Sequence, residues 1–440
     1  MIKMRPKVAA FTVKHVSHIY PVIPLLKSID KWADLVCYID KKNVNIFIDN
    51  NLNFRVYPVD LGDTDYFEES QYEFKKFIIE LNEKNYKKAH LHSLKQDLIA
   101  SHTINKEYFE LLLKDIEQEN VDLIIRDTVD VYGAEIAKIL NIKTTGYITN
   151  NLYNEEYFSI HEDELHIYFA TLPIKEQLGN NYCLNFFKKI RKLNKKIEVN
   201  LNAVHVDCYH NYLLEDDYNL IFSTNYLQPQ EAIPINNINN YRIIYPDFNK
   251  FKIEEKIPKK LKEFISKSKY IIYISTGSFH SEEKQFYKAI INYFANSKFN
   301  LVISCLKWDF EIKEYIKNKN LDEKIYVDNF IPQKYVLSCA DLFFTSGGFN
   351  SILESIYYEV PIIVRPISCE QRMNGIIIEK NKLGVTLYKK NKKSLRDEVL
   401  YLMNNEEIKR SLRINSIDLK KHFGNNYEVI NQKLRRLIND

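Results

Sequence analysis

The chain has 440 residues, of which 45% are hydrophobic and 27% are charged, a composition typical of a globular protein with two domains of ordinary size. The net charge of +4 is small for this length and gives no reason to expect nucleic acid as a partner. No apolar run reaches the roughly 20 residues that a spanning helix requires, which argues against stable membrane insertion. The six cysteines are scattered and form no CxxC pair, which favours free thiols and a cytoplasmic location.

Short β-rich apolar runs alternate with longer amphipathic segments along the chain, and this alternation predicts an α/β protein with parallel sheets. The first half is expected to contain helices at Pro21–Trp32 and Val131–Leu140. The expected strands are, in chain order, Val8–Val13, Leu35–Ile39, Leu123–Ile125, Thr144–Ile148, Tyr270–Ile274, Leu301–Ser304, Ile325–Val327, Leu342–Thr345 and Ile362–Val364.

A stretch rich in Asn and Lys at residues 236–260 contains Pro246 and Pro258 and lacks clear periodicity, which is typical of a linker. We therefore expect a first domain at residues 1–235 and a second at 261–425. A final helix at 426–440 is expected to pack back on the first domain.

A glycine-containing motif follows the expected strand Leu342–Thr345. It reads Ser346-Gly347-Gly348-Phe349-Asn350-Ser351. Two glycines let a ligand approach the backbone, and the N-terminus of the next helix favours an anion such as a diphosphate. Glu354 shares a helical face with Asn350 and Ser351, where its carboxylate suits ribose hydroxyls. An equally good interpretation is a glycine turn before a capped helix.

Polar and aromatic residues also follow three other expected strands. They are Phe330-Ile331-Pro332-Gln333, then Glu370-Gln371 with Asn374, and Ser275-Thr276-Gly277-Ser278. Carboxyl ends of parallel strands meet at one edge of a sheet, where open α/β folds bind ligands. This edge is therefore expected to bring together three kinds of group. They are an aromatic ring that can stack on a base, small hydroxyls that can bind phosphate, and a carboxylate beside an amide that can bind a sugar.

These motifs, together with Val360-Pro361, resemble the C-terminal signature of the UDP-glycosyltransferases, glycosyltransferase family 1, and their spacing resembles the bacterial macrolide-type members. The resemblance implies the GT-B fold, with two facing Rossmann-like domains and an interdomain cleft. It implies a binding role for each motif. Phe330 stacks on the base, and Ile331 and Gln333 lie beside the base or the ribose. The diphosphate is faced by Ser278, Gly347, Gly348, Asn350 and Ser351, the ribose is held by Glu354, and the sugar is held by Glu370 and Gln371.

Ser346 departs from the family pattern, because that position usually holds a histidine that touches the diphosphate. Serine can donate a hydrogen bond but carries no charge. We therefore expect the affinity for the nucleotide-sugar, and the choice of nucleotide-sugar, to differ from those of members with histidine at this position.

The first strand is followed by His15-Val-Ser-His18-Ile-Tyr-Pro21. Family members often carry Gly-His-x-x-Pro at this point, with the histidine as general base, and His18 has the matching spacing to Pro21. His15 is the rival in the wrong register, and a structural histidine is the alternative. Asp127 matches the aspartate that orients this base, with Asp130 as runner-up and a helix N-terminal acid as the alternative interpretation.

The resemblance thus implies a metal-independent, inverting transferase that moves a hexose, most commonly glucose, from a UDP-sugar to a small-molecule acceptor such as a natural product. It needs no cofactor beyond the sugar nucleotide, for which dTDP-sugars are an alternative. The sequence leaves a monomer and a homodimer both open. Three other interpretations stay open. They are a GT-A enzyme with a metal at Asp63-Thr64-Asp65, a silent GT-B-like activator, and a lipid glycosyltransferase resting on membrane through the basic segment Phe186–Lys192.

Overall fold

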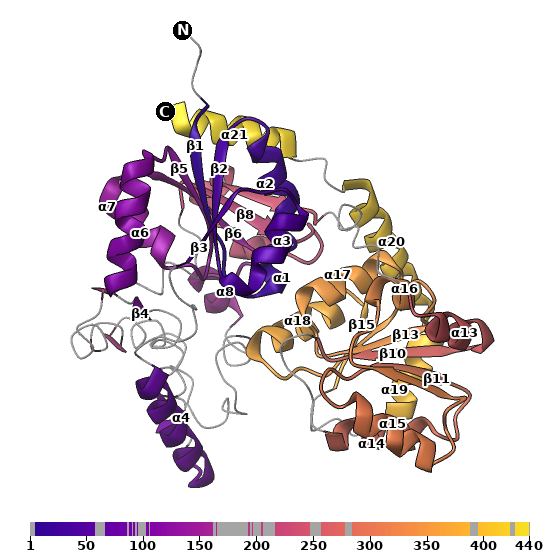
Figure 1. Cartoon of the computed structure of the whole chain (residues 1–440). Coiled ribbons are helices and arrows are strands. Elements are labelled where there is room, and N and C mark those ends of the chain that lie inside the picture. The colour runs from indigo at the N-terminus through magenta and orange to yellow at the C-terminus, as the bar shows by residue number, and fades with distance from the viewer. Residues whose placement is uncertain are drawn as a thin grey trace. The chain divides into compact units, whose positions relative to one another are not determined.

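The computed structural model describes residues 5–57, 67–85, 88–89, 91–92, 95, 103–104, 106–161, 164, 192–193, 196, 204–205, 216–246, 257–277, 284–387, 395–422 and 427–439. The chain divides into a first unit, Met1–Lys250 with His422–Asp440, and a second unit, Phe251–Lys421. Each unit is built on one parallel sheet flanked by helices (Figure 1).

The first unit contains a seven-stranded sheet in the order β3-β2-β1-β5-β6-β8-β9, and every neighbouring pair is parallel. Its strands are β1 Lys7–Phe11, β2 Asp34–Ile39, β3 Phe54–Val56, β5 Leu123–Asp127, β6 Lys143–Ile148, β8 Tyr218–Phe222 and β9 Tyr241–Ile244. A separate antiparallel pair joins β4 Thr103–Ile104 to β7 Val204–His205.

Helices cover both faces of this sheet, with α6 and α7 on one side and α2 and α3 on the other (Figure 1). The described helices of the first unit are α1 Val16–Ile19, α2 Ile23–Asp30, α3 Val44–Asp49, α4 Phe67–Asn82, α6 Lys106–Glu119, α7 Tyr132–Leu140, α8 Glu155–Ile160 and α21 Tyr427–Asn439, with short 3₁₀ turns at Lys41–Asn43, Gln230–Ala232 and Ile235–Asn240.

The second unit contains a six-stranded parallel sheet in the order β12-β11-β10-β13-β14-β15. Its strands are β10 Ile271–Ser275, β11 Asn300–Ser304, β12 Ile325–Asp328, β13 Leu342–Thr345, β14 Ile362–Val364 and β15 Gly384–Thr386. Its helices are α13 Lys259–Lys267, α14 Lys284–Phe294, α15 Asp309–Asn318, α16 Gln333–Leu337, α17 Phe349–Tyr357, α18 Cys369–Lys380, α19 Leu395–Asn404 and α20 Glu406–His422.

Both sheets reverse their strand order once, between β1 and β5 in the first unit and between β10 and β13 in the second. Such a switch point leaves a crevice outside the carboxyl ends of the two strands, because the connections on either side run away from it in opposite directions. The sequence motifs that follow β1, β5, β10 and β13 are therefore brought to these crevices.

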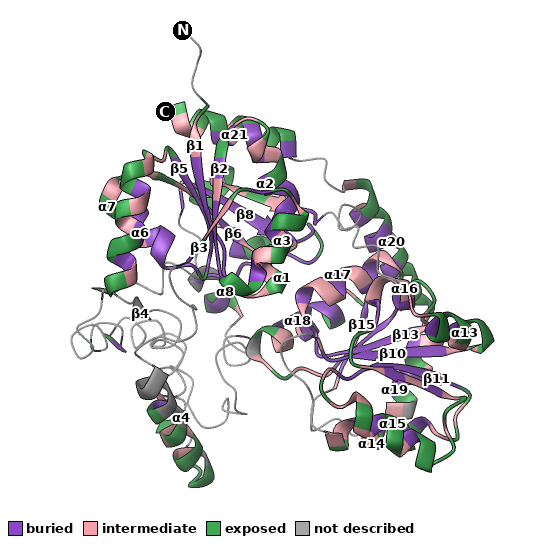
Figure 2. Ribbon diagram, viewed as in Figure 1, coloured by how far each residue is buried: buried purple, intermediate pink, exposed green. Residues whose placement is uncertain are grey.

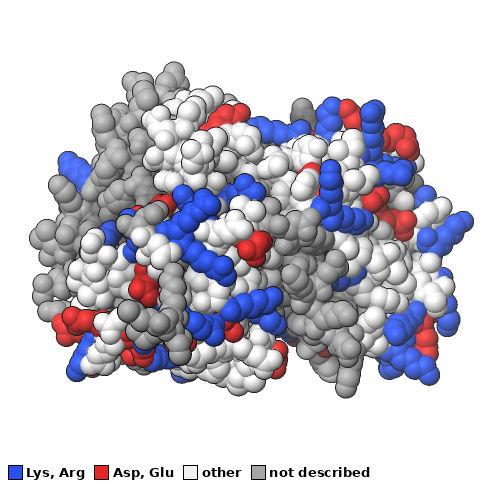
Figure 3. Space-filling view, turned by 90° about the horizontal axis from the view of Figure 1, so that it is seen from above, with Lys and Arg blue, Asp and Glu red and all other residues white. Residues whose placement is uncertain are grey.

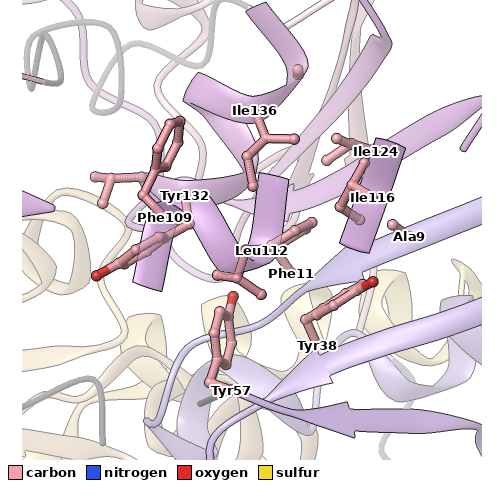
Figure 4. Packing of buried hydrophobic residues seen from close by; sticks show 12 residues of the cluster. Ala9, Phe11, Tyr38, Tyr57, Phe109, Leu112, Ile116, Ile124, Tyr132 and Ile136 are labelled. Carbon is pink, nitrogen blue, oxygen red and sulfur yellow. The ribbon is translucent and has the colours of Figure 1, made fainter. Parts of the chain in front are cut away.

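The strands of both sheets are largely buried, as Figure 2 shows, which explains why they read as apolar runs. In the first unit, aromatic side chains from three neighbouring elements pack against α6 and α7 (Figure 4). The rings of Phe11 and Tyr38 stack with centroids 4.8 Å apart, and the Tyr57 ring is tilted against Phe11 and meets Tyr38 edge-on. This cluster fixes the positions of β1 and β2 beneath the loops that follow them.

Two expected segment limits differ from the structure. The expected linker at 236–260 begins too early, because Tyr241–Ile244 forms β9 and pairs with β8. The expected helix Pro21–Trp32 is shorter, and α2 begins at Ile23 with Pro24 in its first turn, where a missing N–H costs nothing.

The C-terminal helix α21 belongs to the first unit and lies against α2. The Ser28 hydroxyl donates to the Asn431 side chain at 3.4 Å, and the Arg435 guanidinium lies 4.9 Å from the centroid of the Trp32 ring.

On the face seen in Figure 3, basic and acidic side chains are interspersed over the described residues, as the small net charge leads one to expect. Within the described part of the chain, no helix is long and apolar enough to cross a membrane.

Candidate functional site

A histidine and an aspartate meet at the switch point of the first sheet. His18 lies on α1, just beyond β1, and Asp127 is the last residue of β5, which pairs with β1. The two strands end side by side, and His18 Nδ1 lies 2.9 Å from Asp127 Oδ2. The Asp127 side chain is fully buried, whereas 27% of the His18 side chain is exposed. The imidazole of His18 is thus partly exposed to solvent, while the buried Asp127 carboxylate holds it in place through Nδ1.

The Asp127 carboxylate is itself fixed by the loop that follows β5. Its second oxygen, Oδ1, accepts the Val129 backbone N–H at 3.0 Å and the Thr128 hydroxyl at 3.4 Å. Because a carboxylate only accepts, the proton between the two residues sits on His18 Nδ1. The neutral imidazole therefore carries its lone pair on Nε2, the form that a general base requires.

His15 and Asp130, the two rivals, lie nearby in different surroundings. The His15 ring is centred 6.0 Å from that of His18, and burial, followed by the charge of His18, lowers the pKa of His15 to about 4. Asp130 is buried, accepts the Gly133 N–H at 2.8 Å at the start of α7, and lies 3.5 Å from the Tyr57 hydroxyl. Asp130 thus stabilises the helix start, and the carboxylate bonded to His18 is that of Asp127.

Two glycines separate β13 from α17 in the second unit, and they serve different purposes. Gly347 has φ +92°, and an added Cβ would lie 2.7 Å from Val364 Cγ1, so the fold itself requires a glycine there. Gly348 has ordinary φ and ψ, and an added Cβ would meet no atom of the described part of the chain within 4 Å. It forms the N-cap of α17 with no side-chain cap, which leaves the first backbone N–H groups without an intrahelical partner. This helix start suits an anion that approaches closely.

Ser346 is buried at the switch point of the second sheet. Its hydroxyl donates to the Thr276 carbonyl at 2.8 Å and thereby ties the loop after β13 to the loop after β10. The hydroxyl has one hydrogen, and that hydrogen is engaged. The expected donation from Ser346 to a ligand is therefore not available in this arrangement.

A polar network connects α16 to α17. The Gln333 amide nitrogen donates to Glu354 Oε2 at 2.6 Å and to the Ser351 hydroxyl at 3.2 Å, while its carbonyl oxygen lies 3.4 Å from the Tyr273 hydroxyl. These contacts bring three of the expected donor residues together and hold the Glu354 carboxylate in place. Asn350 lies one residue before Ser351 in the first turn of α17 and is partly exposed.

The residues after β12 divide between surface and core. Phe330 is 67% exposed. The Ile331 side chain is buried in the core cluster around Tyr273 and Phe343. Phe330 is thus placed for a stacking partner, whereas Ile331 can offer a ligand only its backbone.

Glu370 and Gln371 lie in the first turn of α18. The Gln371 side-chain oxygen accepts the backbone N–H groups of Ile367 and Ser368 at 2.8 and 3.1 Å, completing a capping box. This fixes the amide so that its NH₂ group is the end that can serve a ligand. Asn374 is buried and donates to the Gly347 carbonyl at 2.9 Å, so it supports the glycine turn. Ser278, Asp63–Asp65 and all of Phe186–Lys192 except Lys192 lie outside the described residues.

Three residues of these sites were not singled out from the sequence. Arg126 and Asp216 form a buried pair behind Asp127, and Tyr273 contacts Gln333. A charged residue inside the apolar strand Leu123–Asp127 was the one available signal for Arg126, since a buried charge needs a partner.

The chain is similar in sequence to known glycosyltransferases. A family model described as "UDP-glucoronosyl and UDP-glucosyl transferase" matches residues 216–419. The NDP-glycosyltransferase YjiC of Bacillus subtilis (strain 168) is 24% identical over 357 residues, which cover 79% of each chain.

Solved structures of low sequence identity share the fold. The glycotransferase of kitacinnamycin is 17% identical, with a TM-score of 0.69 over 99% of this chain and 100% of its own. The UGT2 of Phytolacca americana, solved with UDP-2fluoro-glucose and pterostilbene, is 15% identical, with a TM-score of 0.67 over 99% of this chain and 100% of its own. The similarity shows two Rossmann-like domains with parallel sheets.

Proposed function

The chain belongs to the UDP-glycosyltransferase family and has the GT-B fold, and on this premise we propose that it transfers a hexose, glucose in the first instance, from a UDP-sugar to a hydroxyl of a small-molecule acceptor. The observation that carries the proposal is the contact between His18 and Asp127. A solvent-facing imidazole with its tautomer fixed by a buried carboxylate is the arrangement of a general base.

The proposed reaction is a single displacement. His18 Nε2 takes the proton of the acceptor hydroxyl, whose oxygen attacks the anomeric carbon of the sugar. The bond from that carbon to the diphosphate breaks on the opposite face, so UDP leaves and the anomeric configuration inverts. Asp127 stabilises the imidazolium that forms.

The leaving diphosphate needs a partner for its negative charge. The start of α17 supplies backbone N–H groups and a helix dipole at Gly348, where an added Cβ would meet no atom of the described residues within 4 Å. Fixed dipoles of this kind stabilise developing charge without a metal. We propose a metal-independent reaction on this ground.

The rest of the donor is assigned from the second unit. We propose that Phe330 stacks on the base and that Glu354, held by Gln333, binds the ribose hydroxyls. Glu370 and the Gln371 amide then bind the sugar. A ribose-binding carboxylate favours UDP over dTDP, because deoxyribose lacks the 2′-hydroxyl.

The acceptor and the location are proposed from similarity and chemistry. The Phytolacca americana UGT2 was solved with UDP-2fluoro-glucose and pterostilbene, and a small-molecule acceptor such as a natural product is proposed here. Cys37, Cys305 and Cys339 are free thiols, which supports a reducing, cytoplasmic setting.

The experiment measures UDP release from UDP-glucose by the purified chain, with and without a panel of phenolic and macrolide acceptors, in excess chelator. Transfer in chelator with an inverted anomeric centre, read by NMR of the product, supports the proposal. If neither transfer nor donor hydrolysis occurs across the panels while UDP-sugars still raise the melting temperature, the chain is a silent binding protein. The absence of the usual histidine at 346 gives that second function its specific support.

A further inference from the structure

A buried ion pair lies directly behind the residue that orients His18. The Arg126 side chain is 5% exposed and that of Asp216 is 3% exposed. Arg126 Nε donates to Asp216 Oδ1 and Arg126 Nη2 to Asp216 Oδ2, both at 2.8 Å. This two-pronged contact fixes the plane of the guanidinium, because both parallel hydrogen bonds are made at once.

The remaining nitrogen of the same guanidinium reaches the loop that carries the aspartates. Arg126 Nη1 donates to the backbone carbonyls of Asp127, Thr128 and Asp130 at 3.3, 3.5 and 3.2 Å. The Arg126 side chain thus forms hydrogen bonds with three of the four backbone carbonyls in the segment 127–130. The Asp127 backbone is held at its carbonyl by Arg126, while its carboxylate is held by the Val129 N–H.

The sheet register makes room for this contact. Arg126 on β5 is level with Gly146 on β6, and Gly146 is level with Asn219 on β8. Register neighbours in a parallel sheet share a face, and Gly146 places no side chain on that face between Arg126 and Asn219. Asn219 holds Asp216 through two hydrogen bonds, from the Asp216 N–H at 3.1 Å and to the Asp216 carbonyl at 2.9 Å.

We propose that Arg126 and Asp216 form a positioning pair that holds the loop after β5 so that Asp127 Oδ2 faces His18 Nδ1. The inference rests on the proposed function, since it concerns the base of that reaction. A buried ion pair contributes little to stability compared with apolar residues of similar size, and its best-attested use is to specify one arrangement. The arrangement specified here is that of Asp127.

The test uses Arg126→Lys in the full chain, with Asp217→Asn as matched control. Lysine keeps the charge, but one ammonium cannot make the two-pronged contact and also reach the three carbonyls. Asp217 adjoins Asp216, but it binds Lys143 and the Thr144 N–H at the other end of β6. We expect Arg126→Lys to lower kcat about 10- to 100-fold, as loss of a positioning contact does, with the KM for UDP-sugar unchanged. The control should stay within about twofold of the parent, as surface substitutions usually do.

Two further readouts separate positioning from general damage. In an Asp127→Asn background, Arg126→Lys should cause little further loss of kcat, because the two residues act as one unit. The ¹⁵N resonances of His18 should show the Nδ1–H tautomer in the parent and in Asp217→Asn, and a mixture of tautomers in Arg126→Lys. Because these resonances need no substrate, they test the inference even if no transfer is found. Asp216→Asn serves in the same assays if Arg126→Lys does not fold.

An unchanged kcat together with an unchanged His18 tautomer in Arg126→Lys would overturn the inference. So would an equal loss of kcat in the parent and in the Asp127→Asn background. Absence of transfer by the parent, with the tautomer change still present, would instead count against the proposed function and leave the positioning pair standing.

Discussion

His18 Nδ1 lies 2.9 Å from Asp127 Oδ2, although the two residues are 109 positions apart in the chain. The contact exists because β1 and β5 are neighbours at the switch point of a parallel sheet, so that residues following one strand meet residues ending the other. The geometry assigns each nitrogen of the imidazole a task, with Nδ1 as donor to the carboxylate and Nε2 as the basic atom.

Replacing His18 by alanine should therefore lower kcat by about 10²- to 10⁴-fold, the usual contribution of a general base. The proposed donor site lies on the second unit, so a rise in melting temperature caused by UDP-sugar should persist in this variant. His15→Ala is the control, because Asp127 Oδ2 contacts His18 Nδ1 and the His15 ring is centred 6.0 Å from that of His18, and its kcat should stay within about tenfold of the parent. Near-normal turnover of His18→Ala would mean that another group is the base.

Replacing Asp127 by asparagine should leave the fold intact but reverse the proton arrangement. An amide nitrogen placed at Oδ2 donates to His18 Nδ1, which moves the imidazole proton to Nε2 and removes the base. We expect kcat to fall by about 10⁴-fold, the cost of the same change in a well-studied Ser-His-Asp enzyme. Steady-state kinetics with saturating donor measures the loss, and an unchanged KM for donor is the accompanying expectation.

The two glycines before α17 offer a paired test of the diphosphate site. Gly347→Ala places a Cβ 2.7 Å from Val364 Cγ1 at φ +92°, so this variant should lose stability by about 1 kcal/mol or more. Gly348→Ala meets nothing within 4 Å and should melt at the parent temperature. Its methyl group would nevertheless obstruct a diphosphate, and we expect at least a tenfold rise in the Kd for UDP, or about 1.4 kcal/mol. Equal UDP affinity of Gly348→Ala and the parent would place the diphosphate elsewhere.

The strand pattern could be predicted from the sequence because buried parallel strands read as apolar runs. The runs at β1, β2, β5 and β13 each end near the residue expected, and polar residues that follow such runs meet at the sheet edge. The short strands β3 and β15 have three residues each and give no such run. The strand β9 was taken for linker because it lies at the edge of its sheet in a polar context.

Side-chain partners were less accessible to sequence reasoning. Ser346 was expected to donate to a ligand, yet its hydroxyl bonds the Thr276 carbonyl across the switch point. That partner lies 70 residues away, and nothing in the local sequence indicates it. Arg126 binds Asp216 on the face of β6 where Gly146 has no side chain. This contact depends on strand register rather than on spacing along the chain.

The engaged hydroxyl of Ser346 leads to a further prediction. Ser346→Ala removes the tie to Thr276 and leaves a buried carbonyl without its partner, so the free energy of unfolding should fall by about 1–3 kcal/mol. The Kd for UDP should change less than about threefold, or roughly 0.6 kcal/mol, since the hydroxyl has no hydrogen left for a phosphate. Calorimetric titration with UDP and thermal melting of the same samples measure both quantities. A large loss of UDP affinity without a loss of stability would show that Ser346 binds the donor directly.

Asp130 makes the stability of the first unit depend on pH. Burial raises the pKa of its carboxyl to about 7, and the charge of Asp127 adds to this rise. The Arg126 charge and the Gly133 N–H act in the opposite direction and lower the pKa. The ordinary pKa of aspartate in an unfolded chain is about 3.9. Between these values the folded state holds a proton that the unfolded state has released, so the stabilising effect of that proton is present below about pH 4 and is lost as the pH rises to about 7.

Asp130→Asn should remove this dependence, because the amide keeps an oxygen for the Gly133 N–H and does not titrate. Other carboxylates contribute equally to both proteins, so the difference in unfolding free energy between variant and parent isolates Asp130. That difference should grow in favour of the variant from pH 4 to pH 7, by on the order of 4 kcal/mol at about 1.36 kcal/mol per pKa unit, and then level off. Calorimetric melting of the full chain across this range measures it. A difference that stays constant with pH would mean that Asp130 is already ionised in the folded protein at pH 4.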